Sequence, residues 1–310
     1  MANSTLLALV QAATTELGLL PPQYVVRSAD NTARQFGGLA NRIGQMIGRA
    51  KDWTFLTQRF YITVQPPVTD TGILTKGSTT ITGLQTATVS TLLPGKMVVS
   101  GAGLMNDTRL TAINATAGSV TISMPATASA TETVTFSQDT FPVPPDYLRA
   151  ISRTAWDRSM RWELRGPQSP QQDQWVRSGI VSTGPRRMFR EINNAYRIWP
   201  TPSATDAGSE MVTEYISTYW VTSAAGVGQP NFLADGDTCA FDDDLMVMGL
   251  KWQFFSIKGF AADDLRTDFR RSLTTAMAAD GGSPTLDMAR SNFPIFLSPA
   301  NVPDSGFGNP

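Results

Sequence analysis

The sequence predicts an α+β protein with a helical body, β-hairpin elements and an inserted small all-β barrel or sandwich. Three observations predict it. Apolar residues recur at helical spacing near both ends of the 310-residue chain, and short β-type runs bounded by turn residues lie between them. The composition also changes sharply at about residues 68 and 138. We therefore expect a discontinuous helical body (residues 1–67 and 139–291), a Thr-rich β-domain (residues 68–138) and an extended C-terminal tail (residues 292–310).

Two helices and a strand are expected before the insert. The first helix is capped by Asn3 or Ser4 and runs to about residue 17, and the second runs from about residue 28 or 30 to residue 52. Four glycines lie inside the second helix, at positions 37, 38, 44 and 48. Each costs about 1 kcal/mol of helix propensity relative to Ala, so we expect tight helix packing there. Residues 60–64 are expected to form a strand.

The segment from residue 68 to residue 138 is rich in hydroxyl groups and poor in charge. It holds 17 Thr and 7 Ser among 71 residues, with only six charged side chains. Its β-type runs are separated by turn residues such as Pro94-Gly95 and Asn106-Asp107. This spacing predicts strands at residues 86–90, 97–100, 108–113, 120–124 and 133–136.

The rest of the chain predicts a mixture of helices and strands. Asp146 is expected to cap a short helix at residues 147–152, and Asn193-Asn194 is expected to be the turn of a hairpin. Further elements are a strand at residues 210–220 and helices at residues 242–259 and 262–279.

The composition argues against catalysis, cofactors and metals. The chain has no His, which removes the commonest general base and the His-containing catalytic and zinc sites. It has one cysteine, Cys239, which we expect to be a small buried apolar residue. The acidic cluster from Asp235 to Asp244 is expected to cap a helix and line a loop rather than bind calcium. We therefore expect no enzyme, no cofactor and no metal, and nothing in the sequence brings two of the glutamates Glu163, Glu191, Glu210 and Glu214 to one site.

The sequence also indicates a compartment. A single cysteine fits a reducing environment, no secretory signal is recognised, and no apolar run approaches 18 residues. We therefore expect no membrane contact.

Charge is distributed unevenly along the chain although the net charge is only −1. Residues 139–200 hold ten basic against six acidic side chains, and residues 201–268 hold three basic against eleven acidic ones. Arginines interleaved with Trp could bind nucleic acid, but we favour pairing with the later acidic segment, within or between subunits. The candidate subunit-interface residues are Arg153, Arg158, Arg161, Arg165, Trp156, Trp162, Asp242 and Asp243.

Several motifs resemble structural proteins of tailed bacteriophages. The inserted segment resembles a β-module of phage virion proteins through Lys76-Gly-Ser-Thr-Thr-Ile-Thr-Gly83 and Gly95-Lys-Met-Val-Val-Ser-Gly-Ala-Gly103. The body carries Asp52-Trp53, Phe141-Pro-Val-Pro-Pro-Asp-Tyr147, Trp156-Asp157-Arg158-Ser159, Arg165-Gly-Pro-Gln-Ser-Pro170, Glu214-Tyr-Ile-Ser217, Ala234-Asp-Gly-Asp-Thr238, Phe241-Asp-Asp243 and Gly249-Leu-Lys-Trp252. Together they most resemble the head-to-tail adaptor (connector) proteins of short-tailed, podovirus-type bacteriophages.

The resemblance implies a structural function. Such adaptors form a ring of twelve copies under the portal, receive the tail nozzle on the lower face and leave a channel for DNA ejection. The implied partners are a second copy of the chain, the portal protein and nozzle or tail-fibre proteins, with transient non-specific contact with genomic DNA. The implied location is the tail or neck of the virion, after assembly in the host cytoplasm. The apolar tail supplies the portal-binding candidates Phe293, Ile295, Phe296 and Leu297.

Other interpretations remain open at this point. The chain could be a tail-tube, head-completion or fibre-attachment protein. The insert could recognise a glycan, although its single aromatic residue, Phe136, argues against a sugar platform. A lytic enzyme is the remaining alternative.

Overall fold

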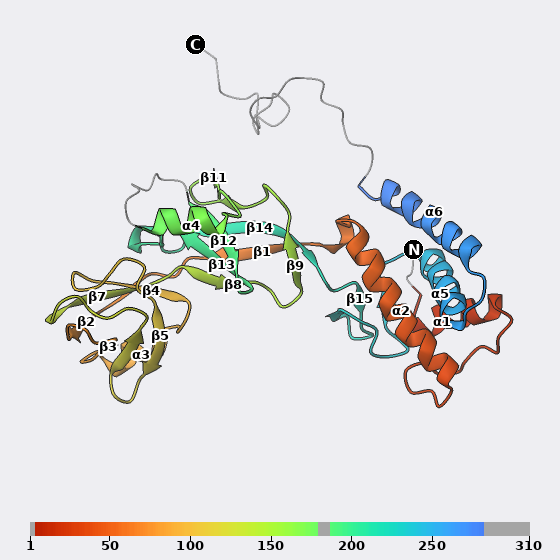
Figure 1. The fold of residues 1–310 in the computed structure, drawn as a ribbon, viewed down its shortest axis with the longest axis horizontal. Helices are drawn as coiled ribbons and strands as arrows, with labels where there is room; N and C mark the ends of the chain where they lie inside the picture. The colour runs from red at the N-terminus through yellow and green to blue at the C-terminus, as the bar shows by residue number, and fades with distance from the viewer. Residues whose placement is uncertain (1–3, 179–186, 282–310) are drawn as a thin grey trace, which may run out of the picture.

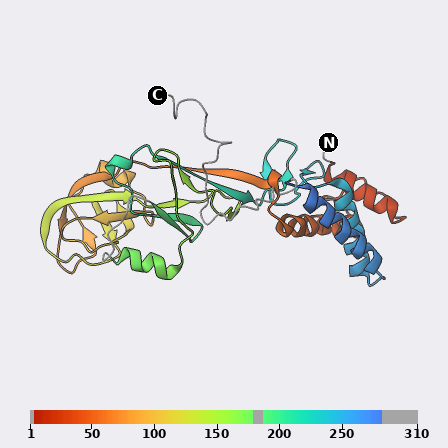
Figure 2. The ribbon, with the colours of Figure 1, turned by 90° about the horizontal axis from the view of Figure 1, so that it is seen from above.

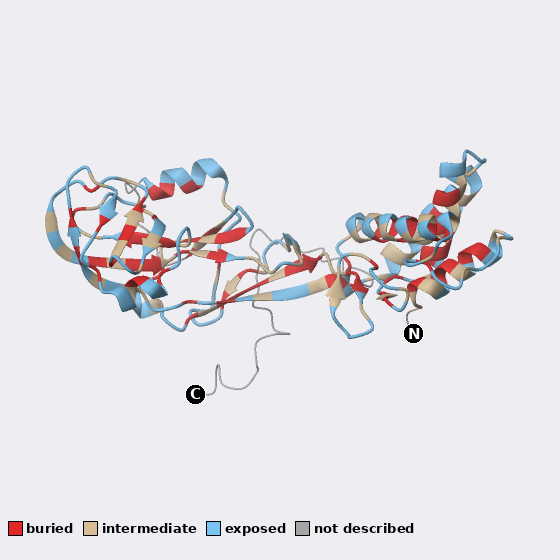
Figure 3. Cartoon of the chain, turned by 90° about the horizontal axis from the view of Figure 1, so that it is seen from below, coloured by how far each residue is buried: buried red, intermediate tan, exposed pale blue. Residues whose placement is uncertain are grey.

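The computed structural model describes residues 4–178 and 187–281, which form an elongated molecule of three lobes (Figure 1). We call them the helical lobe (residues 4–56 and 218–281), the central lobe (residues 57–67, 139–178 and 187–217) and the distal lobe (residues 68–138). Each lobe has a hydrophobic cluster of its own, and buried residues concentrate inside each lobe (Figure 3). The chain enters and leaves the distal lobe through the central lobe.

The helical lobe packs four helices against a small sheet. Its elements are α1 (Leu6–Glu16), α2 (Asn31–Ala50), α5 (Asp243–Lys258), α6 (Asp263–Ala279), the 3₁₀ turn Thr54–Leu56, β15 (Val221–Thr222), β16 (Gly228–Gln229) and β17 (Thr238–Cys239). The strand order is β16-β15-β17. Phe36 of α2 stacks on Phe254 of α5 with ring centroids 4.7 Å apart, which joins the two central helices.

The central lobe consists of two antiparallel sheets and one helix. The first sheet has the order β1-β14-β10-β11, with β9 also pairing with β14, and the second has the order β12-β13-β8. The bounds are β1 (Thr57–Thr63), β8 (Thr140–Pro142), β9 (Tyr147–Ala150), β10 (Trp156–Asp157), β11 (Trp162–Glu163), α4 (Pro170–Arg177), β12 (Met188–Ile192), β13 (Ala195–Trp199), the 3₁₀ turn Ala204–Asp206 and β14 (Glu210–Ser217). Phe60 of β1 stacks on Tyr196 of β13, 5.7 Å between centroids, so the two sheets pack face to face.

The distal lobe consists of two three-stranded sheets that share one core. The orders are β2-β7-β4 and β3-β6-β5. The bounds are β2 (Val68–Leu74), β3 (Thr80–Ile81), α3 (Thr86–Thr91), β4 (Met97–Ser100), β5 (Leu110–Asn114), β6 (Ser119–Ile122) and β7 (Ala130–Gln138). Phe136 and Val134 from one sheet lie in the same cluster as Ile81 and Leu110 from the other. In this part of the structure the sheets form a sandwich, and no closed barrel is present.

The expected α+β class and most of the expected elements are confirmed. The helices at both ends are present, and so is the hairpin of β12 and β13, in which Asn193 and Asn194 adopt φ of 50° and 53°. That pair of positive φ values is what a two-residue hairpin turn requires, and Asn tolerates it. The predicted domain limits stay a prediction.

Three local predictions are wrong. Residues 86–90 form helix α3 instead of a strand, because the helix places Val89, which is fully buried, in the core of the distal lobe. Residues 147–150 form strand β9 instead of a helix, because Asp146 accepts hydrogen bonds from Tyr215 and Ser217 of β14 and cannot cap. The cap of α1 is Thr5, whose side chain accepts from the N–H of Ala8; Asn3 lies outside the described residues.

Three of the four glycines of α2 face side chains from outside the helices, namely Gly37, Gly44 and Gly48, whereas Gly38 faces no atom within 4 Å. A Cβ on Gly44 would lie 2.0 Å from Cη2 of Trp220, which is buried beside β15. The expected close approach is therefore present, but an aromatic ring makes it. Among the helices that the structure describes, none combines the length and apolar character needed to cross a membrane.

Candidate functional site

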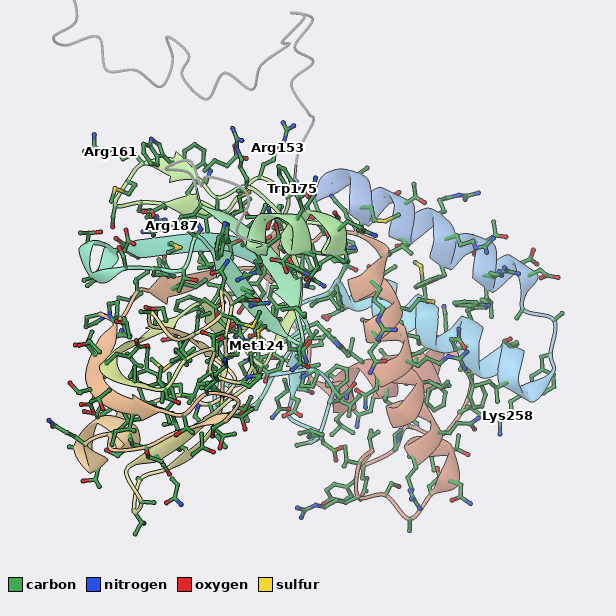
Figure 4. All side chains as sticks on the ribbon, turned by 60° about the vertical axis from the view of Figure 1, so that its left-hand side comes forward. Met124, Arg153, Arg161, Trp175, Arg187 and Lys258 are labelled. Atoms are coloured by element: carbon green, nitrogen blue, oxygen red, sulfur yellow. The ribbon has the colours of Figure 1, made fainter. Side chains whose placement is uncertain are left out.

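The predicted arginines gather at one groove of the central lobe. Arg153, Trp156, Arg158 and Arg161 line an open groove of about 550 Å³ around the β10–β11 hairpin. Arg153 and Arg161 occupy turn positions with φ of 64° and 57°. Figure 4 shows both side chains pointing outward from the same side of the lobe. We call this surface, with the 39% exposed Trp162 that pairs with Asp157 across the hairpin, the arginine groove. Arg165 is exposed but pairs with Met188 near the second sheet and does not line the groove.

The carboxylates inside the arginine groove are already paired. Asp157 is buried and accepts a 2.8 Å bond from Nη1 of Arg187, and Glu214 lies 3.2 Å from Nε of Arg59. Arg158 lies over the ring of Tyr61, 5.6 Å from its centroid. Among the described residues, none of Arg153, Arg158, Arg161 and Arg165 forms an ion pair. The groove therefore carries an excess of positive charge.

The two acidic interface candidates lie on the helical lobe. Asp242 caps α5 by accepting from the N–H of Leu245 at 3.1 Å, and it lines an open groove of about 570 Å³ between α5 and α6. Asp243 accepts hydrogen bonds from the N–H and hydroxyl of Ser4. Asp242 and Asp244 remain exposed. The structure therefore brings the arginines together with one another but not with these aspartates of the same chain.

The expected pairing of the arginines with the later acidic segment is present within the described chain only for Arg187, which contacts Asp206. Pairing between subunits stays a prediction. Arg177, Arg190 and Arg197 pair with Asp107, Asp139 and Asp173 instead. The net charge of a segment does not predict these partners. The ion pairs form within the central lobe and between the central lobe and the edge of the distal lobe.

Asp139 is the centre of this buried network. Its carboxylate is fully buried and accepts from Nη2 of Arg109 at 3.0 Å and from Nε of Arg197 at 3.0 Å, with Nη1 of Arg177 at 3.5 Å. Burial raises the pKa of Asp139, but the hydrogen bond and charge of Arg109 and the charge of Arg197 outweigh it and hold the pKa below its ordinary value. Asp139 therefore stays ionised.

The network joins the distal lobe to the central lobe. Arg109 and Asp107 belong to the distal lobe, whereas Arg177 and Arg197 belong to α4 and β13. Arg177 Nη1 lies 3.3 Å from Asp107, and Arg197 also contacts Asp107. Sequence reasoning missed this joint. One signal in the sequence could have indicated it. Asp107 and Arg109 are two of only six charged residues in the insert, so each could have been expected to form an ion pair.

Other predicted features have structural functions. Asp235 accepts from the N–H groups of Val25 and Val26, and Asp237 accepts from those of Leu233 and Ala234. Among the described residues, no group of acidic or Cys side chains is arranged to hold a metal ion. Cys239 is buried, as expected, and burial raises its pKa to about 12.

The portal-binding candidates Phe293, Ile295, Phe296 and Leu297 lie outside the described residues. The site that the structure does describe is thus an open, positively charged groove around the β10–β11 hairpin. Such a surface suits binding to another macromolecule better than chemistry.

Comparison with known proteins gives one positive finding. The family model described as SU10 adaptor protein matches residues 79–292, which is more than half of the chain. The match begins inside the distal lobe and continues through the central and helical lobes. No curated protein compared with the chain is a significant match.

Proposed function

The chain belongs to the SU10 adaptor protein family, a family of phage head-to-tail adaptors and not of enzymes, and we propose that it forms a ring joining the portal to the tail. The ring leaves a channel through which DNA passes. The family match over residues 79–292 carries this proposal. The match makes the chain a structural protein of the phage virion. The ring, its partners and its channel are our proposal.

The position of the two open grooves supports a ring. The arginine groove lies on the central lobe, and the groove with Asp242 lies on the helical lobe. Different patches that meet head to tail give a heterologous contact, which produces a closed ring when the rotation between copies closes. We propose that Arg153, Arg158, Arg161, Arg165, Trp156 and Trp162 of one copy face Asp242 and Asp243 of the next.

The proposed partners follow from an adaptor's place in the neck of the virion. The upper face of a ring of twelve copies binds the portal through Phe293, Ile295, Phe296 and Leu297. The lower face binds the tail nozzle or tail-fibre proteins. Contact with DNA is transient and non-specific, which fits a net charge of −1.

Light scattering on a sizing column tests the proposal. The protein is run alone and mixed with its portal ring. We expect a defined, saturating complex, and we expect deletion of residues 292–310 to abolish it. Absence of a complex at every mixing ratio would contradict the portal-binding adaptor and favour another tail component, such as a tail-tube, head-completion or fibre-attachment protein.

A further inference from the structure

Strand β1 has one edge that pairs with no other strand of the described chain. The sheet order β1-β14-β10-β11 places β1 at the outside of its sheet. Figure 2 shows β1, in orange, running along one side of the central lobe toward the helical lobe. Six of its seven residues are exposed or half-buried, among them Tyr61 at 48% exposure.

The hydrogen-bond pattern identifies the free backbone groups. On β14, the carbonyls of Glu210 and Glu214 accept from Arg158 and Ile151 on the side away from β1. Odd-numbered β14 residues therefore bond to β1, and their register partners are Gln58, Phe60 and Ile62. The N–H and C=O groups of Arg59, Tyr61 and Thr63 consequently point away from the sheet, whereas the N–H of Thr57 already donates to the carbonyl of Thr54. Among the described residues, no backbone hydrogen bond to the outward groups of Arg59, Tyr61 and Thr63 is present.

This edge lacks the usual protection. Natural sheets shield an open edge with short strands, Lys or Pro residues, or bulges. Strand β1 is seven residues long, contains no Lys and no Pro, and pairs with β14 without a register shift. Its one charge, Arg59, is paired with Glu214. An edge of this kind is suited to binding an added strand.

The end of α6 lies beside the start of β1. Nζ of Lys51 donates to the carbonyl of Met277 at 2.6 Å, and the N–H of Thr54 donates to the Asp280 carboxylate at 3.2 Å. A Cβ on Gly281 would lie 3.7 Å from Cγ2 of Thr54, three residues before β1 begins. The last 29 residues of the chain therefore depart from the same end of the molecule as the open edge.

The length and pattern of this segment match the edge. Residues 282–291 can span about 33 Å when extended, whereas a seven-residue strand is about 23 Å long. Any point along β1 is therefore within reach. The segment Phe293-Pro-Ile-Phe-Leu297 is apolar, and a strand containing Pro is tolerated at the outside of a sheet.

We propose that, in the free subunit, residues 293–297 of the same chain add a strand to the open edge of β1. The occupant uses the N–H groups of Phe293, Ile295 and Leu297, which alternate with Pro294 and so point to one side. The bound segment completes the sheet and protects its edge until assembly. The inference goes beyond the proposed function, because it concerns the subunit without a portal.

Hydrogen exchange followed by mass spectrometry tests the proposal on the free subunit. Three chains are compared: the full chain, a deletion of residues 292–310, and a control deletion of residues 301–310. We expect the amides of Arg59, Tyr61 and Thr63 to exchange about tenfold more slowly in the full chain and the control than in the longer deletion. Equal exchange in all three chains would overturn the proposal. Because no portal is present, the result does not depend on the portal-binding adaptor.

Matched variants separate strand addition from other effects. Tyr61→Pro removes an outward N–H, whereas Tyr61→Ala removes the same ring and keeps the N–H. We expect Tyr61→Pro to abolish the slow exchange of Arg59 and Thr63, and Tyr61→Ala to retain it. Loss in both variants to the same extent would contradict backbone pairing. Protection that increases with protein concentration would assign the occupant to a second copy and contradict the intramolecular form.

Discussion

Asp139 shows how a single buried charge can hold two lobes together. Its carboxylate has no exposed surface and is surrounded by guanidinium groups of Arg109, Arg177 and Arg197. Burying an ion is unfavourable, and only well-placed partners compensate for it. Removing the carboxylate would leave Arg109 without an ion-pair partner in the described chain and would take one partner each from Arg177 and Arg197. The network therefore depends on Asp139 more than on any one arginine.

Asp139→Asn is therefore expected to lower the free energy of unfolding by about 3–5 kcal/mol, as for other broken buried ion pairs. Urea unfolding, followed by circular dichroism, measures the change. Asp268→Asn is the control, because Asp268 is exposed on α6 and a surface substitution changes stability by less than about 0.5 kcal/mol. A loss below about 1 kcal/mol in Asp139→Asn would show that the arginines do not need this carboxylate.

The same carboxylates predict how stability depends on pH. Burial raises the pKa of Asp139 and of Asp173, but Arg109 and Arg177, respectively, outweigh it, and both pKa values lie below the ordinary 3.8. The unfolded chain then binds more protons than the folded one near that pH, so stability increases with pH there. The stabilisation is complete above the ordinary pKa and is lost as the pH falls below it.

Acid titration of unfolding tests this dependence. We expect the melting temperature of the wild type to fall steeply below about pH 4, where carboxyl groups of ordinary pKa protonate in the unfolded chain. The Asp139→Asn variant is expected to show a shallower fall, since it lacks one of the responsible groups. Parallel curves for the two proteins would assign the acid sensitivity to other carboxylates.

At the scale of the element, α2 carries glycines whose environments are opposite. Gly44 lies under Trp220, and a Cβ there would clash with three atoms of the indole ring. Gly38 is exposed, and a Cβ there would meet nothing within 4 Å. Helix propensity favours Ala over Gly by the same amount at both sites, so packing decides the sign at each.

The two substitutions are expected to act in opposite directions. Gly38→Ala should stabilise the protein by up to about 1 kcal/mol through helix propensity. Gly44→Ala should destabilise it by about 1–3 kcal/mol, because Trp220 must leave its buried position. Thermal unfolding of both variants against the wild type measures the difference. Stabilisation by both would mean that Trp220 moves away at little cost.

Elements with local signals could be predicted from the sequence. Helix α5 has a capping aspartate, Asp242, at its start and Gly259 at its end with φ of 78°. Strand β9 and helix α3 could not be predicted, because distant contacts decide them: pairing with β14 for β9, and burial of Val89 in the distal core for α3. Local propensity was overruled in both.

The candidate site shows the same difference between local and distant signals: the arginine groove could be predicted from the sequence, whereas the Asp139 network could not. Arg153, Arg158 and Arg161 lie close together in sequence, so one hairpin brings them to one groove. The Asp139 network includes side-chain pairs 30 to 90 positions apart in the chain, such as Arg109 with Asp139 and Arg197 with Asp107. Charge totals by segment contain no information on such pairs.

At the scale of the whole molecule, the three lobes have separate hydrophobic cores. The central lobe and the helical lobe each carry an open groove, so each lobe can offer its own binding surface. The central and distal lobes are tied by the buried network, and the helical lobe is linked to the central lobe by β1, β14 and the exposed pair of Arg149 with Asp52. An assembly protein needs a surface that is open before assembly. The arginine groove is open, and its arginines form no ion pair within the part of the chain that the structure describes.

The triple variant Arg153→Ala, Arg158→Ala and Arg161→Ala tests whether the arginine groove joins neighbouring subunits. These side chains are exposed and form no ion pair in the part of the chain that the structure describes, so the unfolding free energy should change by less than about 0.5 kcal/mol each. Loss of charge complementarity should weaken assembly on the portal by at least about tenfold, and added salt should weaken the wild type in the same way. Light scattering of portal mixtures measures this.

The control removes the same charge from exposed sites on α2 and α6, through Arg34→Ala, Arg42→Ala and Arg270→Ala. Equal assembly by both triple variants would show that neighbouring subunits meet through another surface.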